Sequence, residues 1–502
     1  MSRLVSTYGD FDVSVPDIRG GEIKKIKCDV VIIGGGGSGL SAAVRCAQKG
    51  LEVIIIDKMS VLGGNTRLAG GLLVTSSSIL KKKGIHDTTD SHIKKYLSHH
   101  LYRIDRDIVT RFIKNTGVFY DWMAKLGMDT ENHRIVMDNV VMIKDRKDMG
   151  PLRNPAYGPG LMGTEVTDTL IAAAERYGVT VFKETQAKEL VVKDGGICGV
   201  KAEGNGYNYE IECQNAVLSS GGFGRDTKLL KKYFPEYFSS DNYFTHYCLA
   251  HCTGDGLFMA QKAGAKTGEN MSFGLESMVH IPGAHSLQRV MQEPIGIIVS
   301  SIGKRFVPED DIENGEFLLD EQPDGIAWYL FNDKLKDYLY ELALEHRRYG
   351  DWMPDYDEYH NDIKSEIENG LMIYGNTISE LADAMGAPAD VLENTIKNYE
   401  IYCRNKRDEE LYKDPEYLVD MGEDGPWYGI RLLRKFDVTM GGVSINKNME
   451  VLRPDGSIIK GLYAAGDIAS GWMGPDYGPL FSSFAWAVNS GFLAAESISR
   501  ST

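Results

Sequence analysis

Glycines and an acidic residue near the N-terminus have the spacing of a dinucleotide-binding turn. Gly34, Gly36 and Gly39 fit the pattern G-x-G-x-x-G directly after the apolar run Val30–Ile33. The first glycine allows the tight turn, the second lets a pyrophosphate approach the backbone, and the third lets the following helix pack on the strand. Asp57 ends the next apolar run, about 20 residues further on, where a carboxylate binds ribose hydroxyls. The stretch therefore predicts a βαβ unit that binds a dinucleotide.

A second glycine-rich loop follows Asp57 and favours FAD over a nicotinamide cofactor. Residues 63–71 read GGNTRLAGG. A flavin enzyme needs backbone that passes close to the diphosphate and the isoalloxazine ring, whereas an ordinary nicotinamide domain has no need of this loop. The N-terminus of the first helix also offers free N–H groups to the phosphates.

Later glycine turns complete the predicted FAD site. Residues 219–224 read SSGGFG after an apolar strand, residues 253–256 read TGDG before a helix, and residues 461–467 form a strand that ends in Gly-Asp. The helix that begins near Ser482 would stabilise negative charge at the N1/O2 edge of a flavin. The residues predicted to bind FAD are Gly34, Gly36, Ser38, Gly39, Asp57, Lys58, Gly64, Asn65, Thr66, Gly70, Gly71, Ala187, Gly222, Asp255, Asp467, Ser482 and Ser483.

The composition excludes several classes of protein. The chain has 502 residues, of which 43% are hydrophobic, and this is enough for two domains with a large core. A net charge of −16 disfavours nucleic acids and anionic membranes as partners. No signal peptide and no membrane-spanning run are predicted.

The seven cysteines are scattered and contain no C-x-x-C pair. This pattern predicts neither a disulfide framework nor a metal site, and it indicates a reducing cytoplasm. The spacing Cys248-x-x-x-Cys252 is interpreted as incidental.

The pattern along the chain predicts a nucleotide-binding domain with an insertion. Strands and helices alternate until about residue 240, and the same alternation returns at Gly461–Asp467. The intervening segment is rich in Tyr, Trp, Asp and Glu and has helical patterns at Ile378–Met385 and Pro388–Tyr402. We therefore predict a lead-in at 1–24, a FAD-binding domain in two parts at 25–274 and 426–502, and a capping or substrate domain at 275–425.

These motifs, in this order, resemble one flavoprotein family over nearly the whole chain. VVIIGGGGSGLSAA, DKMSVLGGNTRLAGG, VLSSGGFGRD, TGDGLFMAQKAGA, GKRFVPED, TMGGVSI and GLYAAGDIASG are similar to those of the fumarate reductase/succinate dehydrogenase flavoprotein superfamily. That superfamily includes fumarate and urocanate reductases and 3-ketosteroid dehydrogenases. The resemblance implies an α/β fold in which a Rossmann-like FAD-binding domain is interrupted by an α+β capping domain, with the active site at their junction. Members with covalent flavin carry His-Ser where this chain has Asn65-Thr66, which implies non-covalent FAD.

The catalytic residues of this family are replaced here. The arginine that clamps the substrate in fumarate reductases falls on Tyr477, the histidine before T-M-G-G falls on Asp437-Val438, and the acid arginine falls near Glu313. Ketosteroid dehydrogenases carry a tyrosine at about the place of Tyr477, so the resemblance at the active site is closer to them. His280 lies near the place of another substrate-binding histidine. The resemblance thus implies Tyr477, Glu313 and His280 as the catalytic residues, while Arg305 is interpreted as structural.

The predicted reaction is hydride transfer between flavin N5 and a carbon–carbon bond that a carbonyl activates. The missing arginines favour an ene-reductase or dehydrogenase of a neutral hydrophobic ketone, such as a 3-ketosteroid or a polycyclic or phenolic compound. The alternatives are a reductase of a small unsaturated carboxylate like fumarate or urocanate, and a non-catalytic flavoprotein subunit. A small hydrophobic substrate and an external electron donor or acceptor (NADH, reduced flavin or a redox protein) are the expected partners. The exact substrate, the direction and the oligomeric state stay open.

Overall fold

The fold places a large mixed sheet, with a parallel centre, at one end of the molecule. The computed structural model describes residues 15–136, 140–143, 162–235, 243–245, 248–268, 271–279, 285–311, 316–346, 355–422, 424–474 and 482–501. Within them the largest sheet has the strand order β1-β10-β9-β19-β11-β2-β3-β7, with β18 paired to β19 and β8 paired to β9. Its strands are β1 Glu22–Lys27, β2 Val30–Ile33, β3 Val53–Ile56, β7 Thr180–Phe182, β8 Thr185–Lys193, β9 Gly196–Gly204, β10 Tyr207–Glu212, β11 Asn215–Leu218, β18 Glu450–Leu452 and β19 Ile458–Ala464.

The centre of this sheet is parallel and buried on both faces. The neighbours β19, β11, β2, β3 and β7 all pair in parallel. All four residues of β2 (VVII) and of β3 (VIII) are buried. Continuous apolar runs of this kind are typical of strands that have helices on both sides.

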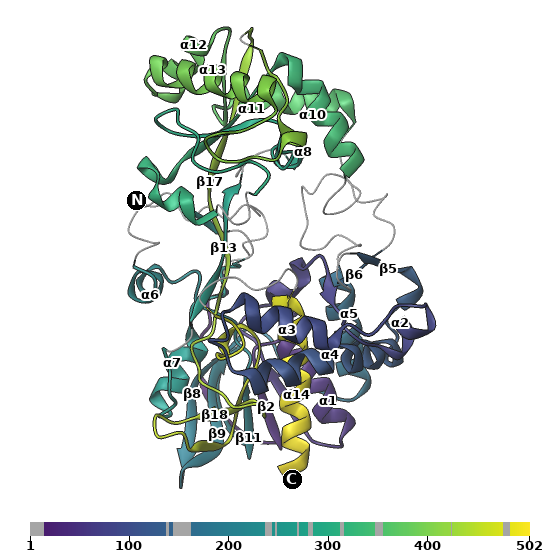
Figure 1. Ribbon diagram of the computed structural model, residues 1–502. Helices are drawn as coiled ribbons and strands as arrows, with labels where there is room; N and C mark the ends of the chain where they lie inside the picture. The colour runs from purple at the N-terminus through teal and green to yellow at the C-terminus, as the bar shows by residue number, and fades with distance from the viewer. Residues whose placement is uncertain are drawn as a thin grey trace.

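Helices rich in small residues cover the sheet. α1 (Gly37–Gln48) follows β2, and α14 (Ser482–Ser501) lies beside it (Figure 1). Their Gly, Ala and Ser residues allow close approach, and Arg45 on α1 forms an ion pair with Glu496 on α14 at 2.7 Å. The other helices of this body are α2 Ser78–Lys82, α3 Thr89–His99, α4 Arg106–Leu126, α5 Met162–Arg176, α6 Thr227–Tyr233 and α7 Asp255–Lys262. A small sheet is formed by β4 Leu72–Leu73, β5 His133–Val136 and β6 Val140–Ile143.

A second body lies at the other end of the molecule. Figure 1 shows α10–α13 gathered opposite α1 and α14, with β13 and β17 running between the two ends. The helices here are α8 His285–Val290, α10 Asp333–His346, α11 Tyr356–Glu368, α12 Ile378–Met385 and α13 Ala389–Asn405. The second large sheet consists of β12 Tyr243–Thr245, β13 Ser272–Val279, β14 Ile297–Ser300, β15 Ala327–Asn332, β16 Met372–Gly375 and β17 Trp427–Met440.

The long strand β17 connects the two bodies. Its first half pairs with β15 and β16, and its second half pairs with β12 and β13. The buried apolar side chains form two clusters: one draws on residues 28–265 and 436–498, and the other on residues 287–432. We propose that these two cores are the FAD-binding and capping domains that the sequence predicts.

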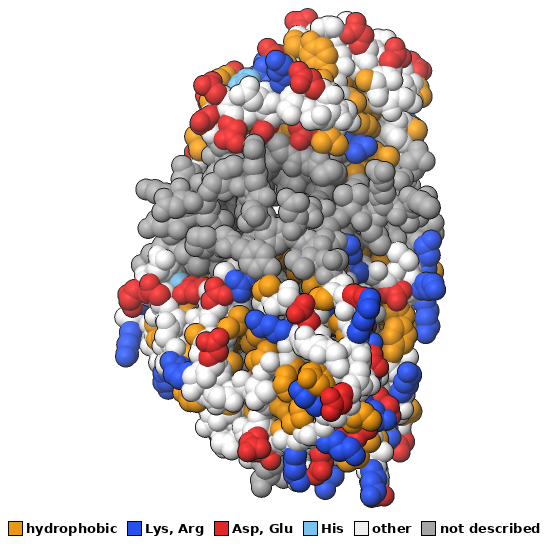
Figure 2. All heavy atoms as spheres, turned by 180° about the vertical axis from the view of Figure 1, so that it is seen from behind, with side chains coloured by type: hydrophobic (Ala, Val, Ile, Leu, Met, Phe, Trp, Pro, Cys, Tyr) orange, Lys and Arg blue, Asp and Glu red, His pale blue; other side chains and the backbone are white. Residues whose placement is uncertain are grey.

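Charged side chains are distributed differently over the two bodies on the face seen in Figure 2. The upper body shows mostly Asp and Glu with little Lys and Arg, whereas side chains of both signs are mixed over the lower body.

The second core contains an ion cluster that is shielded from solvent. Arg305 donates to both Glu309 oxygens, at 2.9 and 2.8 Å, and to Asp408 at 2.9 Å. Lys413 lies 3.2 Å from Glu309, and the side chains of all four residues are fully buried. Arg305 therefore ties the loop after β14 to the segment after α13, in agreement with the structural role interpreted from the sequence.

Removal of the Arg305 cation is expected to destabilise this core. Arg305→Met leaves Glu309 and Asp408 buried with one fewer counter-charge, and such a loss costs about 3–5 kcal/mol in the free energy of unfolding. The control is Lys397→Met, which breaks an exposed pair with Glu393 at 3.9 Å and should cost less than about 1 kcal/mol. Urea unfolding of both variants measures the difference, and equal losses would contradict the assignment.

Candidate functional site

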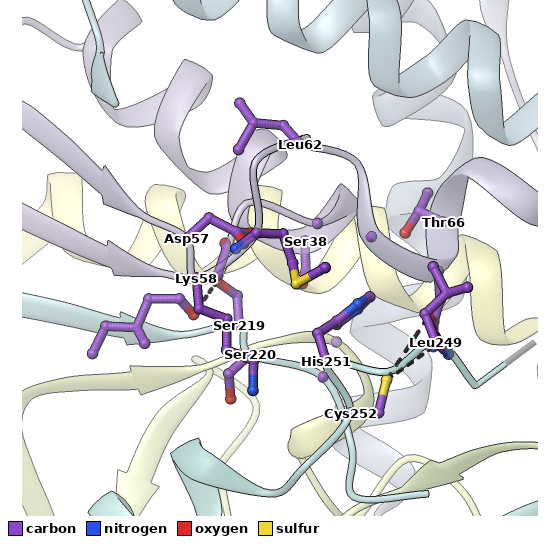
Figure 3. Close-up of a pocket in the computed structure, with 18 of the residues that line it drawn as sticks. Ser38, Asp57, Lys58, Leu62, Thr66, Ser219, Ser220, Leu249, His251 and Cys252 are labelled. Carbon is purple, nitrogen blue, oxygen red and sulfur yellow. Dashed lines mark hydrogen bonds between the residues drawn. The ribbon is translucent and has the colours of Figure 1, made fainter. Parts of the chain in front are cut away.

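A pocket lies where β2, β3 and β11 end and α1 begins. It holds about 1240 Å³ of space between atoms, counting the part open to solvent. Figure 3 shows Ser38, Asp57 and Lys58 on one side of it, Thr66, Leu249 and Cys252 on the other, and His251 between them. The carboxyl ends of parallel strands are the usual binding edge of such a sheet.

The first glycine turn is fixed by its backbone. Gly34 has φ +107°, a conformation that side chains disfavour, and its N–H donates to the Ile56 carbonyl at 2.8 Å. A Cβ on Gly39 would stand 1.8 Å from the Gly34 oxygen, so only glycine fits there. The Ser219 hydroxyl donates to the carbonyls of Ile33 and Gly34 at 3.0 and 2.9 Å. The turn can therefore hold one shape, with the start of α1 aimed at the pocket.

The start of α1 is left open for an anionic group. Its N-cap residue, Gly36, supplies no capping side chain, and Gly36 and Ser38 line the pocket. The Thr66 hydroxyl accepts from the Gly37 N–H at 3.2 Å, which brings the second glycine loop against the first. An isolated β-bridge between the backbones of Gly36 and Gly63 also holds the two glycine loops together. Free N–H groups at a helix start and the helix dipole favour a phosphate.

Asp57 anchors the rim of the pocket at the end of β3. Its carboxylate accepts from the Gly35 N–H at 2.6 Å and from the Met59 N–H at 2.8 Å. Burial raises the pKa of this carboxyl, while the two N–H groups and the positive charges of His251 and Lys58 oppose the rise. Asp57 therefore links both glycine loops.

A second acid, Asp255, also lines the pocket. Lys58 forms an ion pair with Asp255 at 2.8 Å, and Gln186 and Thr253 donate to the same carboxylate at 2.9 Å. Burial raises the pKa of Asp255, but Lys58 and these hydrogen bonds outweigh it, so that the pKa lies below its usual value. The ion pair joins Lys58, after β3, to the start of α7, and Gln186 joins β8 to the same carboxylate.

Among the described residues, five buried serine hydroxyls are left without a hydrogen-bond partner, those of Ser41, Ser220, Ser272, Ser300 and Ser482. Of these five serines, Ser220 is the one that lines the pocket. Buried hydroxyls are rarely left unpaired in folded proteins. The Ser220 hydroxyl therefore points to a polar ligand in the pocket.

The structure brings most of the predicted cofactor residues together. Those that line the pocket are Gly34, Gly36, Ser38, Asp57, Lys58, Gly64, Asn65, Thr66, Ala187, Asp255 and Asp467. Those outside its lining are Gly39, Gly70, Gly71, Gly222, Ser482 and Ser483. The three predicted catalytic residues, Tyr477, Glu313 and His280, lie outside the described residues.

The lining also contains residues that the sequence did not single out as cofactor ligands. Leu62, Gln186, Ser220, His251 and Cys252 all contribute to it. Ser220 belongs to the S-S-G-G-F-G turn and His251-Cys252 precedes T-G-D-G, so their places beside glycine turns were the available signal.

Comparisons with known proteins assign the family. The model of the FAD binding domain family matches residues 29–477. The chain belongs to this family, which is part of the fumarate reductase/succinate dehydrogenase flavoprotein superfamily. The protein is therefore a FAD-dependent oxidoreductase, as the sequence predicted.

Curated relatives cover different substrates. The chain is 28% identical to a vinyl phenol reductase of Lactiplantibacillus plantarum over 90% of this chain and 92% of that protein. It is 26% identical to a 3-oxosteroid 1-dehydrogenase of Mycobacterium tuberculosis over 93% of this chain and 97% of that protein. It is 24% identical to an NADH:fumarate oxidoreductase of Klebsiella pneumoniae over 88% of this chain, but it spans only 44% of that protein.

A solved structure confirms the fold class. The open conformation of a flavocytochrome c3 fumarate reductase matches with a TM-score of 0.72 at 22% identity, covering 95% of this chain and 78% of that one. The α/β fold with a Rossmann-like FAD-binding domain is therefore confirmed.

The residues in the pocket fit FAD. The open start of α1 suits the pyrophosphate, Asp57 suits the ribose hydroxyls and Ser220 offers an unpaired hydroxyl. Among the described residues no group of His, Cys, Asp and Glu could hold a metal ion, and no helix there is long and apolar enough to cross a membrane.

Asp467 should make the stability of the FAD-free protein depend on pH. Burial raises the pKa of its carboxyl to about 7, with Cys252 adding to the rise and His251 opposing it. The folded state then holds a proton that the unfolded state, with a pKa of about 3.9, has lost, so stability falls as the pH rises from about 4 to 7. Asp467→Asn removes the titrating carboxyl. As the pH rises from 5 to 8, the free energy of unfolding of the variant should therefore increase by about 2–3 kcal/mol relative to that of the parent.

Urea unfolding of both FAD-free proteins at the two pH values measures this gain. Parallel changes in the parent and the variant would show that Asp467 titrates normally.

Proposed function

We propose that the protein reduces or oxidises a carbon–carbon bond beside a carbonyl or an aromatic ring in a neutral, hydrophobic substrate. A 3-ketosteroid or a polycyclic or phenolic compound is the preferred class. When bound, FAD supplies hydride transfer at N5 to or from that bond. The protein positions the substrate and supplies or removes a proton on the opposite side.

The observation that carries this proposal is the presence of a tyrosine, Tyr477, at this place in the sequence. It stands in the sequence Gly474-Pro-Asp-Tyr-Gly-Pro479, where the resemblance to fumarate reductases places an arginine that clamps a carboxylate. Its segment is bracketed by Asp467, which lines the pocket, and by Ala487 on α14, which also lines it. A tyrosine hydroxyl can polarise a neutral carbonyl or exchange a proton with the neighbouring carbon, but it cannot neutralise a carboxylate.

Two further observations favour a neutral substrate. Arg305, the arginine of the G-K-R-F-V segment, is occupied by Glu309 and Asp408 in the second core. The vinyl phenol reductase and the 3-oxosteroid 1-dehydrogenase match this chain over most of both lengths, and their names describe a phenol and a ketosteroid. Reduction of a small unsaturated carboxylate is the alternative, which the similarity to the NADH:fumarate oxidoreductase favours.

The cofactor is proposed to be non-covalent and to exchange electrons with an external partner. Asn65 and Thr66 occupy the place of the His-Ser pair of covalent relatives. All seven cysteines are free, which supports a reducing cytoplasm as the location.

Anaerobic reoxidation of the reduced protein tests the proposal. After reduction by dithionite, a 4-ene-3-ketosteroid or a vinylphenol should restore the visible flavin absorbance rapidly, while fumarate and urocanate should not. Tyr477→Phe should keep its FAD content and slow this reoxidation about 100-fold or more, because a positioned acid contributes roughly 10²–10⁴.

Rapid reoxidation by fumarate or urocanate alone would favour the carboxylate alternative. An unchanged rate in Tyr477→Phe would remove the tyrosine from the mechanism.

A further inference from the structure

A second cavity lies among α1, α4 and α14. It holds about 1070 Å³ of space between atoms, counting the part open to solvent. In Figure 1 these three helices lie at the end of the molecule opposite α10–α13. The described residues that line the cavity are Arg45, Asp107, Thr110, Arg111, Lys114, Asn115, Val118, Lys447, Phe492, Leu493, Glu496 and Arg500. None of these residues lines the FAD pocket, so the cavity is a separate feature of the fold.

Positive charge dominates this cavity, although the protein as a whole is acidic. Five of its described lining residues are Lys or Arg and two are Asp or Glu, whereas the whole chain has a net charge of −16. Both acids already have a partner in the lining, since Glu496 lies 2.7 Å from Arg45 and Asp107 lies 3.3 Å from Lys447. The lining cations that form no ion pair with a described residue are Arg111, Lys114 and Arg500.

Arg111 is oriented by neutral partners. Its Nη1 donates to the Lys447 carbonyl and to Asn448 Oδ1 at 2.8 Å, and its Nη2 donates to the Ser497 hydroxyl at 3.4 Å. These groups fix the guanidinium without neutralising it. Burial and the positive charge of Arg500 hold the pKa of Arg111 below its usual value, although two nearby glutamates oppose this shift. The fold thus keeps two cations close together, and an anion between them relieves their repulsion.

Lys114 and Arg500 are exposed and available to a ligand. Lys114 follows Arg111 by three residues on α4, a spacing that puts both side chains on one face of the helix. Arg500 lies in the last turn of α14. A guanidinium binds phosphate oxygens through paired N–H groups, and an ammonium binds them as a point charge. The three cations together therefore have the chemistry of a phosphate site.

Apolar side chains lie beside these cations. Phe492 and Leu493 line the cavity and are each 4% exposed, whereas Val118 is 54% exposed. The Arg45 guanidinium lies over the Phe492 ring, 4.9 Å from its centroid. Val118 follows Lys114 by four residues on α4, so these two side chains share one face of the helix. A ligand that has both a phosphate and an apolar part therefore fits this lining better than a bare phosphate.

We propose that this cavity binds an organic phosphate, that is, a phosphate ester with an apolar carbon skeleton. The phosphate oxygens accept from Arg111, Lys114 and Arg500, and the carbon skeleton covers Val118. Binding is non-covalent, so no bond of the ligand is made or broken. The inference does not rest on the proposed reaction, because none of the lining residues belongs to the FAD pocket.

The helices α1 and α14 both extend from the FAD pocket to this cavity. Ser38 on α1 and Ala487 on α14 line the pocket, while Arg45 and Phe492 on the same helices line the cavity. The chain from Ala487 to Phe492 corresponds to about 7.5 Å of helix. The ligand therefore does not compete with FAD, and its binding is measured on protein whose FAD pocket is filled.

Titration calorimetry on the FAD-saturated protein tests the site. The probes are butyl phosphate and inorganic phosphate, at an ionic strength held constant with KCl because salt screens exposed charges. Butyl phosphate should bind about threefold or more tighter than inorganic phosphate, since its chain removes apolar surface from water. Equal or weaker binding of butyl phosphate would overturn the organic part of the proposal, and no binding of either probe would overturn the site.

Two double variants with the same loss of charge locate the binding. Lys114→Gln/Arg500→Gln removes the two exposed cations of the cavity, whereas Lys82→Gln/Arg404→Gln removes an exposed Lys and an exposed Arg from the ends of α2 and α13. The first should weaken butyl phosphate binding about tenfold or more, and the second should leave it unchanged. Visible flavin absorbance and Tm show that both variants keep FAD and the fold. Equal affinities of the two variants would overturn the inference.

Val118→Asn separates the apolar contact from the charges. It should weaken butyl phosphate binding about threefold and leave inorganic phosphate binding unchanged, because Val118 contacts only the carbon skeleton. An equal loss for both probes, or no loss for butyl phosphate, would overturn this contact. None of these measurements uses the flavin reaction, so they are informative whether or not the proposed function holds.

Discussion

The cofactor pocket depends on one carboxylate that is shared by two loops. Asp57 directly follows β3 and accepts from the N–H of Gly35 in the first glycine turn and from the N–H of Met59, which leads into the second glycine loop. Both bonds are charge-assisted and largely shielded from water, which makes them stronger than ordinary hydrogen bonds. Because Gly34 and Gly39 leave the turn only one packed arrangement, the position of Asp57 fixes the start of α1. The remainder of the pocket is built outward from this point.

Another part of the pocket wall is assembled from distant parts of the chain. Lys58 reaches Asp255 across nearly 200 residues of sequence, and Asn65 reaches Cys252 over a similar separation. The first link joins Lys58, which precedes the second glycine loop, to Asp255 at the start of α7. The second link joins Asn65, in that loop, to Cys252 in the segment before α7. Segments far apart in the sequence therefore meet in one wall of the pocket.

Local pattern was enough to predict the elements that bind the nucleotide. The apolar spacing predicted strands at Val30–Ile33 and Val53–Ile56 and a helix at Ile378–Met385. The structure has these three elements with the same bounds. β17 was not predicted, because its 14 residues serve two cores and show no single alternation. The hydrogen bond between Asn65 and Cys252 was also missed, since it arises only when segments far apart in sequence pack together.

Asp57 is expected to hold FAD in this pocket. The most direct test is the dissociation constant of FAD for the stripped protein, measured by flavin fluorescence for the parent, Asp57→Asn and Asp29→Asn. Asp29 also accepts from a backbone N–H, that of Glu52 at 2.8 Å, but it is outside the pocket. A hydrogen bond to a charged group is worth about 1.5–3 kcal/mol, so Asp57→Asn should weaken FAD binding by roughly tenfold to a hundredfold, with Asp29→Asn unchanged. Equal affinities for all three proteins would contradict the account.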